Sequence, residues 1–267
     1  MVNGTRAEAQ KGLKGLCPNC QAELSAKCGG RRNNHWAHKG SRNCDPWWEP
    51  ETEWHRFWKN KYDIKWQEVV IFDENTGEKH IADIKTNYGL VLEFQHSHLS
   101  LGEQTKREAF YKNMIWVVDG ARLKRDYSRF YKTIRNISPT SEGKLLLAEF
   151  ADEVFPKNWL TCTSPVVFDF RGNELLVEQD DLRNHIFCLL PSKKQITILD
   201  RHFIRYSRDN FINLTISGEW QSEILSWQND PNINKPIRSF VKQPIKAQNS
   251  PHYYDSKRGA FIKRRRF

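Results

Sequence analysis

Two short runs of alternating apolar and polar residues flank a turn at Asn87-Tyr88-Gly89, and this pattern constrains the fold most. Residues 80–86 and 89–95 are expected to form antiparallel strands, because alternation with period two puts every second side chain on one face. One face is apolar throughout and would pack against a core. The other carries Asp83 and Glu93, which are equidistant from the centre of the turn and should oppose each other.

Opposed carboxylates on neighbouring strands repel each other unless a cation lies between them. Oxygen ligands in this arrangement suit a hard divalent ion such as Mg²⁺, which would turn an unfavourable pair into a binding site. The alternative is the ordinary polar face of a hairpin, on which neighbouring acids are common. The hairpin alone leaves both interpretations open.

A helix is predicted over residues 50–62, because proline suits a first helical turn, acids favour its start and lysines favour its end. Glu51, His55 and Lys59 (or Trp58) recur every four residues and therefore share one helical face. This row would complete a metal and phosphate site beside the hairpin, or else it is a solvated face with a favourable Glu–Lys spacing.

The surrounding pattern indicates a mixed α/β unit. Further strands are expected near residues 67–72 and 115–118, and a second helix over 101–113. The predicted organisation is a zinc-binding element over residues 1–46, a core over 47–137 and an accessory region with a basic tail over 138–267. Within the first element, residues 1–16 are expected to be poorly structured.

The segment 17–46 is rich in Cys, His, Gly and Asn and is too short for a core of its own, so it should need a metal. Cys17 and Cys20 present two thiolates to one ion, and His35 and His38 add two imidazoles, as a tetrahedral structural Zn²⁺ site requires. Six residues compete for the four positions: Cys17, Cys20, Cys28, His35, His38 and Cys44. Reduced cysteines with incidental histidines are the alternative.

The net charge of +10 is concentrated at the two ends of the chain. Residues 1–45 carry eight Lys and Arg against three acids, residues 252–267 carry six against one, and the remainder is balanced. Two basic ends around a segment of balanced charge are typical of a protein that binds a polyanion such as nucleic acid. Alternatively, Lys263–Arg266 is a solvated tail that aids solubility.

The 267 residues include ten Trp and fifteen Phe, which argues against wholesale disorder and allows one large domain or two modest ones. No run approaches the roughly 20 apolar residues of a membrane span, and the first 16 residues lack the apolar stretch of a secretory signal. A soluble, cytoplasmic protein with no membrane partner is therefore expected.

In this order and spacing, the motifs of residues 17–119 resemble the competence protein CoiA-like nuclease family of the PD-(D/E)XK superfamily. The matching motifs are Cys17-Pro-Asn-Cys20, His35-Trp-Ala-His38, Glu51-Thr-x-x-His55 with Lys59, Ala82-Asp83-Ile84, Glu93-Phe-Gln-His-Ser97, Leu99-Ser100, Arg107-x3-Tyr111 and Trp116-Val-Val-Asp119. Each motif is weak alone, and the resemblance rests on their occurring together in this order. Residues 155–159 and 165–169 match the family more loosely.

The resemblance implies a restriction-endonuclease-like mixed sheet flanked by helices, with a zinc-binding N-terminal element. It implies that a divalent metal, Mg²⁺ or Mn²⁺, activates water for phosphodiester cleavage in nucleic acid, with DNA favoured over RNA. Asp83 and Glu93 would be the metal ligands. A role in DNA uptake and processing or in defence against foreign DNA follows from the same resemblance.

The main departure from the superfamily pattern is Gln95, which takes the place usually held by the motif lysine. Lys59 or Lys85 would substitute for the missing cation, and Lys59 is favoured. Glu51 and His55 would add to the metal or water network. The family's basic residue before the aspartate falls on His80. Glu68 is a reserve acid whose placement the sequence does not decide. Arg107 and Tyr111, one turn apart on the predicted second helix, would contact the phosphate backbone, or Tyr111 is instead part of the core.

Two alternatives to a nuclease remain at this point. If the lost lysine means lost catalysis, the chain would be a nucleic-acid-binding module of the same fold. A zinc-stabilised scaffold that works through protein partners is the second alternative.

Overall fold

The computed structural model describes residues 1–30, 32–40, 44–47, 49, 51–134, 145–148, 150–172, 174, 178, 181–191, 201–230, 252–255 and 260–263. The chain divides into two compact units, Met1–Gln228 and Asn229–Phe267. In the second unit, β12 (His252–Asp255) and β13 (Ala260–Lys263) pair as an antiparallel hairpin. The predicted nucleic-acid contacts of the basic tail, Lys263–Arg266, fall on side chains outside the described residues.

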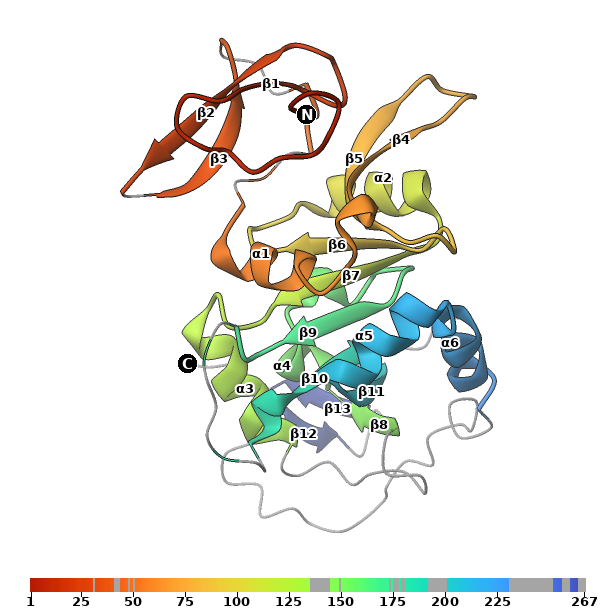
Figure 1. The fold of residues 1–267 in the computed structure, drawn as a ribbon. Coiled ribbons are helices and arrows are strands. Elements are labelled where there is room, and N and C mark those ends of the chain that lie inside the picture. The colour runs from red at the N-terminus through yellow and green to blue at the C-terminus, as the bar shows by residue number, and fades with distance from the viewer. Residues whose placement is uncertain are drawn as a thin grey trace. The chain divides into compact units, whose positions relative to one another are not determined.

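An eight-stranded mixed sheet, in the order β4-β5-β6-β7-β9-β10-β11-β8, forms the centre of the first unit (Figure 1). Its strands are β4 (Gln67–Phe72), β5 (Lys79–Lys85), β6 (Val91–Gln95), β7 (Met114–Asp119), β8 (Leu145–Ala148), β9 (Val166–Asp169), β10 (His185–Leu189) and β11 (Arg201–Ser207). β7 runs parallel to both β6 and β9, and the other neighbours are antiparallel. The prediction of a mixed α/β sheet flanked by helices is confirmed.

The helices of the first unit connect and flank these strands (Figure 1). They are α1 (Glu53–Lys59), α2 (Leu101–Tyr111), α3 (Lys124–Ile134), α4 (Ala151–Val154), α5 (Arg208–Ser217) and α6 (Trp220–Gln228), with short 3-10 turns at Ile64–Trp66, Lys157–Trp159 and Leu182–Asn184. No helix among the described residues is both long and apolar enough to cross a lipid bilayer.

Strands from both sides of residue 137 belong to the same sheet. Trp116 of β7 pairs with Val166 of β9, and Asp119 pairs with Asp169 at the other end of this ladder. The boundary that the sequence predicts between a core and an accessory region therefore lies inside one continuous sheet. The later strands extend the sheet of the first half.

The predicted meander and both predicted helices are present, with shorter helices. The first helix begins at Glu53 because the Thr52 hydroxyl accepts from the His55 amide (3.3 Å) while His55 Nδ1 accepts from the Thr52 amide (3.2 Å). α2 ends at Tyr111, because Lys112 adopts φ 60° and cannot continue the helix. Helix ends are set by such caps more than by hydrophobic pattern.

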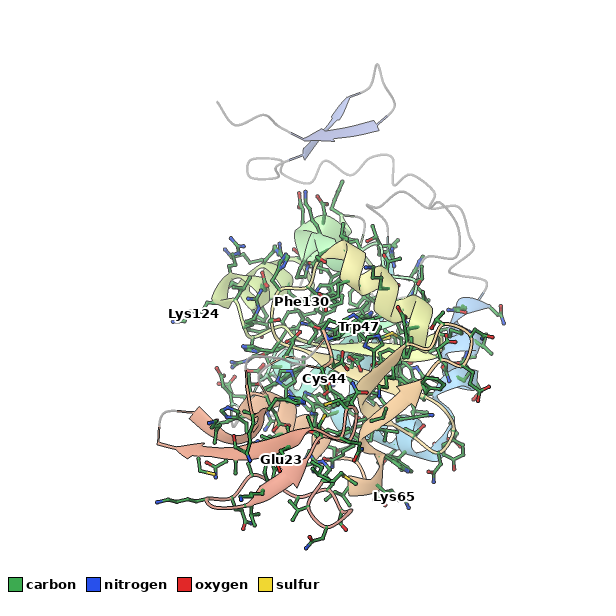
Figure 2. The ribbon with its side chains drawn as sticks, turned by 90° about the horizontal axis from the view of Figure 1, so that it is seen from above. Glu23, Cys44, Trp47, Lys65, Lys124 and Phe130 are labelled. Carbon is green, nitrogen blue, oxygen red and sulfur yellow. The ribbon has the colours of Figure 1, made fainter. Side chains whose placement is uncertain are left out.

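Aromatic side chains fill the core between the sheet and the helices. Phe130 of α3, labelled in Figure 2, is fully buried, and its ring stacks on that of Phe170 with a centroid distance of 4.4 Å. On α1, Trp54 and Trp58 both pack against Phe94 of β6, with ring centroids 6.1 and 6.0 Å apart. These contacts hold α1 against the acid-bearing hairpin.

The N-terminal element is a three-stranded antiparallel sheet of β1 (Lys14–Leu16), β2 (Glu23–Gly29) and β3 (Arg32–His38). Residues 1–16 are structured, contrary to the prediction: Val2 and Thr5 form a β-bridge, and the Trp36 indole donates to the Ala7 carbonyl at 2.7 Å. The polar composition of the segment did not predict the Trp36 hydrogen bond or the pairing of β1 with β2.

Candidate metal centre and carboxylate site

The turn between β1 and β2 brings Cys17 and Cys20 to one side of the chain. The Cys17 amide donates to the Ala22 carbonyl (2.9 Å), and the Gln21 amide donates back to the Cys17 carbonyl (2.9 Å). Gln21 takes φ 61°, which closes the turn tightly. The two thiols of the C-x-x-C motif therefore point into the same space.

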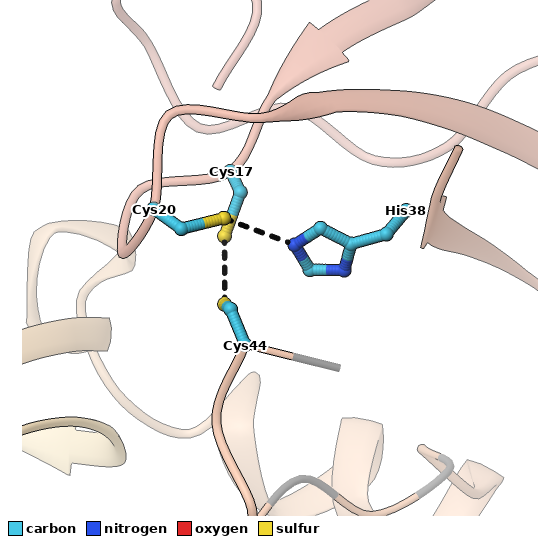
Figure 3. A group of neighbouring side chains, drawn as sticks. All are labelled: Cys17, Cys20, His38 and Cys44. Atoms are coloured by element: carbon cyan, nitrogen blue, oxygen red, sulfur yellow. Dashed lines mark hydrogen bonds between the residues drawn. The ribbon is translucent and has the colours of Figure 1, made fainter. Parts of the chain in front are cut away.

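Four donor atoms meet at this turn: those of Cys17, Cys20, His38 and Cys44, all within 4.8 Å of one another (Figure 3). The sulfurs of Cys17 and Cys44 are 3.5 Å apart, and Cys20 Sγ lies 3.3 Å from His38 Nε2. Zn–S bonds of about 2.3 Å in a regular tetrahedron give edges of about 3.8 Å, close to these separations. The group could hold a zinc ion, and four protein ligands are typical of a structural site.

The surroundings of the thiols shift the pKa values of Cys20 and Cys44 in opposite directions. Burial, together with the neighbouring Cys17 and Cys20, raises the pKa of Cys44 to about 12. For Cys20, burial also acts upward, but bonds to the Ala22 backbone and to His38 outweigh it and lower the pKa to about 7. One thiolate thus hinders ionisation of the next, a conflict that a bound divalent cation removes.

His35, predicted as a ligand, is not a member of this group. His35 and His38 are three residues apart on β3, where side chains alternate, so they lie on opposite faces of the strand. Their cross-strand partners differ accordingly: Lys27 for His35 and Leu24 for His38. Cys44 supplies the fourth donor instead, whereas the Cys28 thiol donates to the Ala9 carbonyl at 3.6 Å.

Asp83 and Glu93 approach each other where the β5–β6 ladder ends. The last paired residues are Ile84 and Leu92, in the register that the sequence predicts. Beyond them, Glu93 Oε1 accepts from the Asp83 amide (3.3 Å), and Asp83 Oδ2 accepts from the Phe94 amide (2.9 Å). Each carboxylate thereby replaces a missing ladder bond and is fixed against the opposite strand.

The ammonium group of Lys59 is surrounded by three acids. Its Nζ lies 2.9 Å from Asp83 Oδ1, 3.3 Å from Glu51 Oε1 and 3.4 Å from Glu68 Oε1. Burial acts to lower the pKa of Lys59, but the charges of Asp83, Glu68 and Glu51 raise it above its ordinary value. Of the two lysines that the sequence offers, Lys59 is the one whose ammonium contacts Asp83.

Glu93 is buried and forms an ion pair with Arg107. Its Oε2 lies 3.2 Å from Arg107 Nη1, and both side chains are about 5% exposed. Burial, reinforced by the charge of Asp83, raises the pKa of Glu93 to about 8 despite Arg107. Arg107, expected to face phosphate, instead binds Glu93, Glu103 and the Trp47 carbonyl.

Glu68 enters the site through an unusual backbone conformation. It takes φ 54° inside β4, between the paired residues Gln67 and Val69, which turns its carboxylate toward Lys59 and Arg6. Burial would raise the pKa of Glu68, but Lys59 and Arg6 lower it to about 2. Left-handed backbone in a non-glycine residue is unfavourable and is concentrated at functional sites.

His55 and Gln95, both predicted site residues, have their polar atoms engaged elsewhere. His55 Nε2 donates to the Phe94 carbonyl (2.9 Å) and Nδ1 accepts from Thr52, so the ring fastens α1 to β6. Gln95 Nε2 donates to a carboxylate oxygen of Glu49 and to the Ser97 carbonyl (3.3 Å). Glu49 was missed because it lies in a segment without periodicity or motif.

Tyr111 is buried at 7% exposure, and its hydroxyl has no hydrogen-bond partner among the described residues. Burial raises its pKa, and the charges of Glu93, Asp45 and Asp83 raise it further. A buried hydroxyl without a partner is rare in folded proteins, and this one lies where the charges of three acids act on it. Its ring meanwhile packs edge-on against Trp47 at 5.8 Å.

Comparison with known proteins gives one partial similarity. The chain is 32% identical over 129 residues to the competence protein CoiA of Bacillus subtilis (strain 168). The match covers 44% of this chain and 34% of that relative, so the chain spans only about a third of the relative's length. No family model and no solved structure matches the chain. The chain is therefore similar to a CoiA-type competence protein over part of its length.

Proposed function

We propose that the chain is a metal-dependent nuclease that hydrolyses phosphodiester bonds in DNA, with Asp83 and Glu93 as ligands of Mg²⁺ or Mn²⁺. The observation that carries this proposal is the fixed approach of the two carboxylates, each bonded to the backbone amide of the other strand. Lys59 contacts Asp83 from the adjoining helix and supplies the cation that Gln95 does not.

The residues of the site fit a divalent cation. Every carboxylate oxygen of the pair has one protein partner and retains a second lone pair. Burial and the charge of Asp83 raise the pKa of Glu93 despite Arg107, so a bound cation would favour the ionised carboxylate, and the buried Tyr111 hydroxyl has no hydrogen-bond partner among the described residues. Hard oxygen donors of this kind are those that Mg²⁺ prefers.

Residues of the chain have separable roles in this mechanism. When bound, a divalent metal ion polarises the phosphate and lowers the pKa of its water. Asp83 and Glu93 hold that ion, and the Lys59 ammonium stabilises negative charge developing on the phosphate. Glu51 and Glu68 orient Lys59, and Arg107 holds Glu93 in place.

The thiol centre has a structural role in the proposal. Its four N and S donors leave a zinc ion without an open position for substrate. Zinc would therefore hold the N-terminal element together, and the divalent ion of the carboxylate pair would perform the chemistry.

DNA is the proposed substrate, and a role in DNA uptake and processing is the proposed context. The excess of Lys and Arg over acids in segment 1–45 favours a polyanionic partner such as nucleic acid. The partially similar relative is named a competence protein, which favours DNA over RNA. Cleavage of RNA alone would contradict this substrate assignment.

The proposal is tested by cleavage assays on single- and double-stranded DNA and RNA, with Mg²⁺, Mn²⁺ or EDTA. We expect cleavage of DNA that EDTA abolishes and that Asp83→Ala removes, while Glu78→Ala, which changes an exposed acid in the turn between β4 and β5, retains it. Cleavage that survives EDTA or Asp83→Ala would contradict the mechanism. Binding of nucleic acid without cleavage would identify a binding module instead.

Two lysine variants test the assignment of the catalytic cation. Lys59→Gln is expected to lower the cleavage rate by about 100-fold or more, as loss of a charge-stabilising donor does. Lys85→Gln, on the same sheet, should retain most of the rate. The reverse ranking would assign the role to Lys85.

A further inference from the structure

The described contacts connect the thiol centre to the carboxylate pair along two routes. Both start at Cys44 and its neighbours, where Figure 2 shows Cys44 and Trp47 between the N-terminal element and the sheet. We propose that the thiol centre, when it holds its metal ion, positions Asp83 and Glu93, so that the N-terminal element controls the geometry of the carboxylate site. The inference deepens the proposed function and rests on it.

The first route runs through three consecutive residues at the start of β5. The Lys79 ammonium donates to the carbonyl of Asn19, inside the C-x-x-C turn, at 2.7 Å. Asp45, directly after Cys44, accepts from the His80 ring (2.9 Å) and the Ile81 amide (2.8 Å). The strand is thus held by the C-x-x-C turn at Lys79 and by Asp45 at His80 and Ile81, shortly before it presents Asp83.

Asp45 is well placed to transmit the position of Cys44. Its side chain is 5% exposed, and its carboxylate takes three hydrogen bonds, from the His80 ring and from the amides of Ile81 and Trp47. The Asn19 side chain also donates to Cys44 Sγ at 3.6 Å, which ties the two halves of the thiol centre together. A buried carboxylate with this many donors has one stable position.

The second route reaches Glu93 through Trp47 and Arg107. The Trp47 ring stacks on His80 with a centroid distance of 3.3 Å and an interplanar angle of 11°. The Trp47 carbonyl accepts from Arg107 Nη2 at 2.9 Å, and Arg107 Nη1 contacts Glu93 Oε2 at 3.2 Å. Movement of Trp47 would therefore move the cation that holds Glu93.

The first route ends at Asp83 on β5, and the second ends at Glu93 on β6. Residues 44–47 form a bend that belongs to no helix or strand, so its position depends on the bonds at its ends. The metal-binding thiol of Cys44 fixes one end, and contacts with β5 and α2 fix the other. Supporting residues of this kind affect metal affinity by about 10- to 100-fold when they are lost.

Hydrogen–deuterium exchange tests the inference without reference to activity. In Cys44→Ser, we expect loss of zinc and exchange at least about tenfold faster in peptides covering β5, β6 and α2, because their local opening becomes easier. Peptides covering β10 and β11 should keep wild-type exchange. Cys28→Ser is the matched control, since this cysteine lies in the same element but outside the donor group.

Uniform acceleration over the whole first unit, or no acceleration in β5 and β6 after zinc loss, would overturn the inference. The first result would mean that the thiol centre contributes only to global stability. If the wild-type protein neither binds Mn²⁺ nor cleaves nucleic acid, the proposed function fails, and the exchange pattern still decides whether the two centres are coupled.

A second variant separates the connecting residues from the metal ligands. Asp45→Asn removes the charge that holds His80 and leaves the four donors of the thiol centre in place. We expect zinc content to be retained and Mn²⁺ affinity at the carboxylate site, followed by calorimetry, to fall by about tenfold or more. Unchanged Mn²⁺ affinity with zinc retained would contradict the role of Asp45.

Discussion

The thiol centre and the carboxylate site differ in how their charges are balanced. The donors of the thiol centre are three cysteines and one histidine, and its thiols obstruct one another's ionisation. The carboxylate site contains its own cations, because Lys59 contacts three acids and Arg107 contacts Glu93. The thiols of the first centre would need an added cation to ionise together, whereas the acids of the second already lie beside cations of the protein.

Under the proposed function, this difference would distinguish a structural metal ion from a catalytic one. A site that the protein has already neutralised in part can bind and release a hydrated ion, as turnover with Mg²⁺ requires. A site of four soft donors binds its ion tightly and couples it to folding. The following predictions test whether the two centres respond independently where this account says they should.

The largest effect is expected at the thiol centre. Cys17→Ser should release zinc and lower the free energy of unfolding by several kcal/mol, on the order expected when metal binding and folding are coupled. Elemental analysis and thermal melting measure the two quantities. Cys28→Ser should retain zinc, and full zinc content in Cys17→Ser would remove Cys17 from the ligand set.

The second-largest effect on stability is expected at Asp169, a buried acid that binds two side chains of α1. Asp169 is fully buried, accepts from the Trp54 and Trp58 indoles at 3.0 Å each, and contacts Arg208. Asp169→Asn leaves Arg208 without a counter-charge and should cost about 3–5 kcal/mol in urea unfolding.

Asp169→Asn also distinguishes the two centres. Zinc content should stay at the wild-type level, because the residue supports the helix that carries Lys59 and not the thiol centre. Glu23→Gln removes an exposed ion pair with Lys39 and should change the free energy of unfolding far less, because solvent screens exposed pairs. Equal costs for the two variants would contradict the structural role given to Asp169.

A pH dependence should distinguish the carboxylate site. Burial and the charge of Asp83 raise the pKa of Glu93 to about 8 in the folded protein, above the 4.5 of a free glutamate. Between these values the folded protein holds a proton that the unfolded chain has lost, so this group makes metal-free stability fall as pH rises. Glu93→Gln should reduce that slope in unfolding measured from pH 5 to 8, and an unchanged slope would contradict the assignment.

The smallest effect is expected from His35. His35→Ala should leave zinc content unchanged and alter the free energy of unfolding by less than about 1 kcal/mol, because the residue lies outside the donor group. His38→Ala is the paired variant and should lose zinc. Elemental analysis decides between them, and zinc loss in His35→Ala would contradict the ligand set.

The local sequence pattern was sufficient to predict the hairpin and three of the four members of the thiol centre. The register of β5 and β6 follows from alternation and from a turn at Asn87–Gly89, and the pairing of Ile84 with Leu92 confirms it. Cys17, Cys20 and His38 follow from short-range spacing. His35 lies outside this group because it is on the other face of β3, which a segment without visible strand periodicity did not reveal.

The remaining site residues depend on contacts distant in sequence. Lys59 reaches Asp83 from a helix 24 positions earlier, and Arg107 reaches Glu93 from α2. Asp45 and Glu49 lie in a stretch without periodicity, so no local signal could assign them to β5 and Gln95. The joining of β7 to β9 likewise depends on long-range pairing that short-range pattern does not encode.

Titration of Mn²⁺ into zinc-loaded wild-type and Asp83→Asn protein, followed by electron paramagnetic resonance, tests the central claim most directly. The account predicts that the wild-type protein binds Mn²⁺ and that Asp83→Asn loses this binding while its zinc content stays the same. Equal Mn²⁺ affinity in the two proteins would contradict the claim that Asp83 and Glu93 jointly hold a divalent ion.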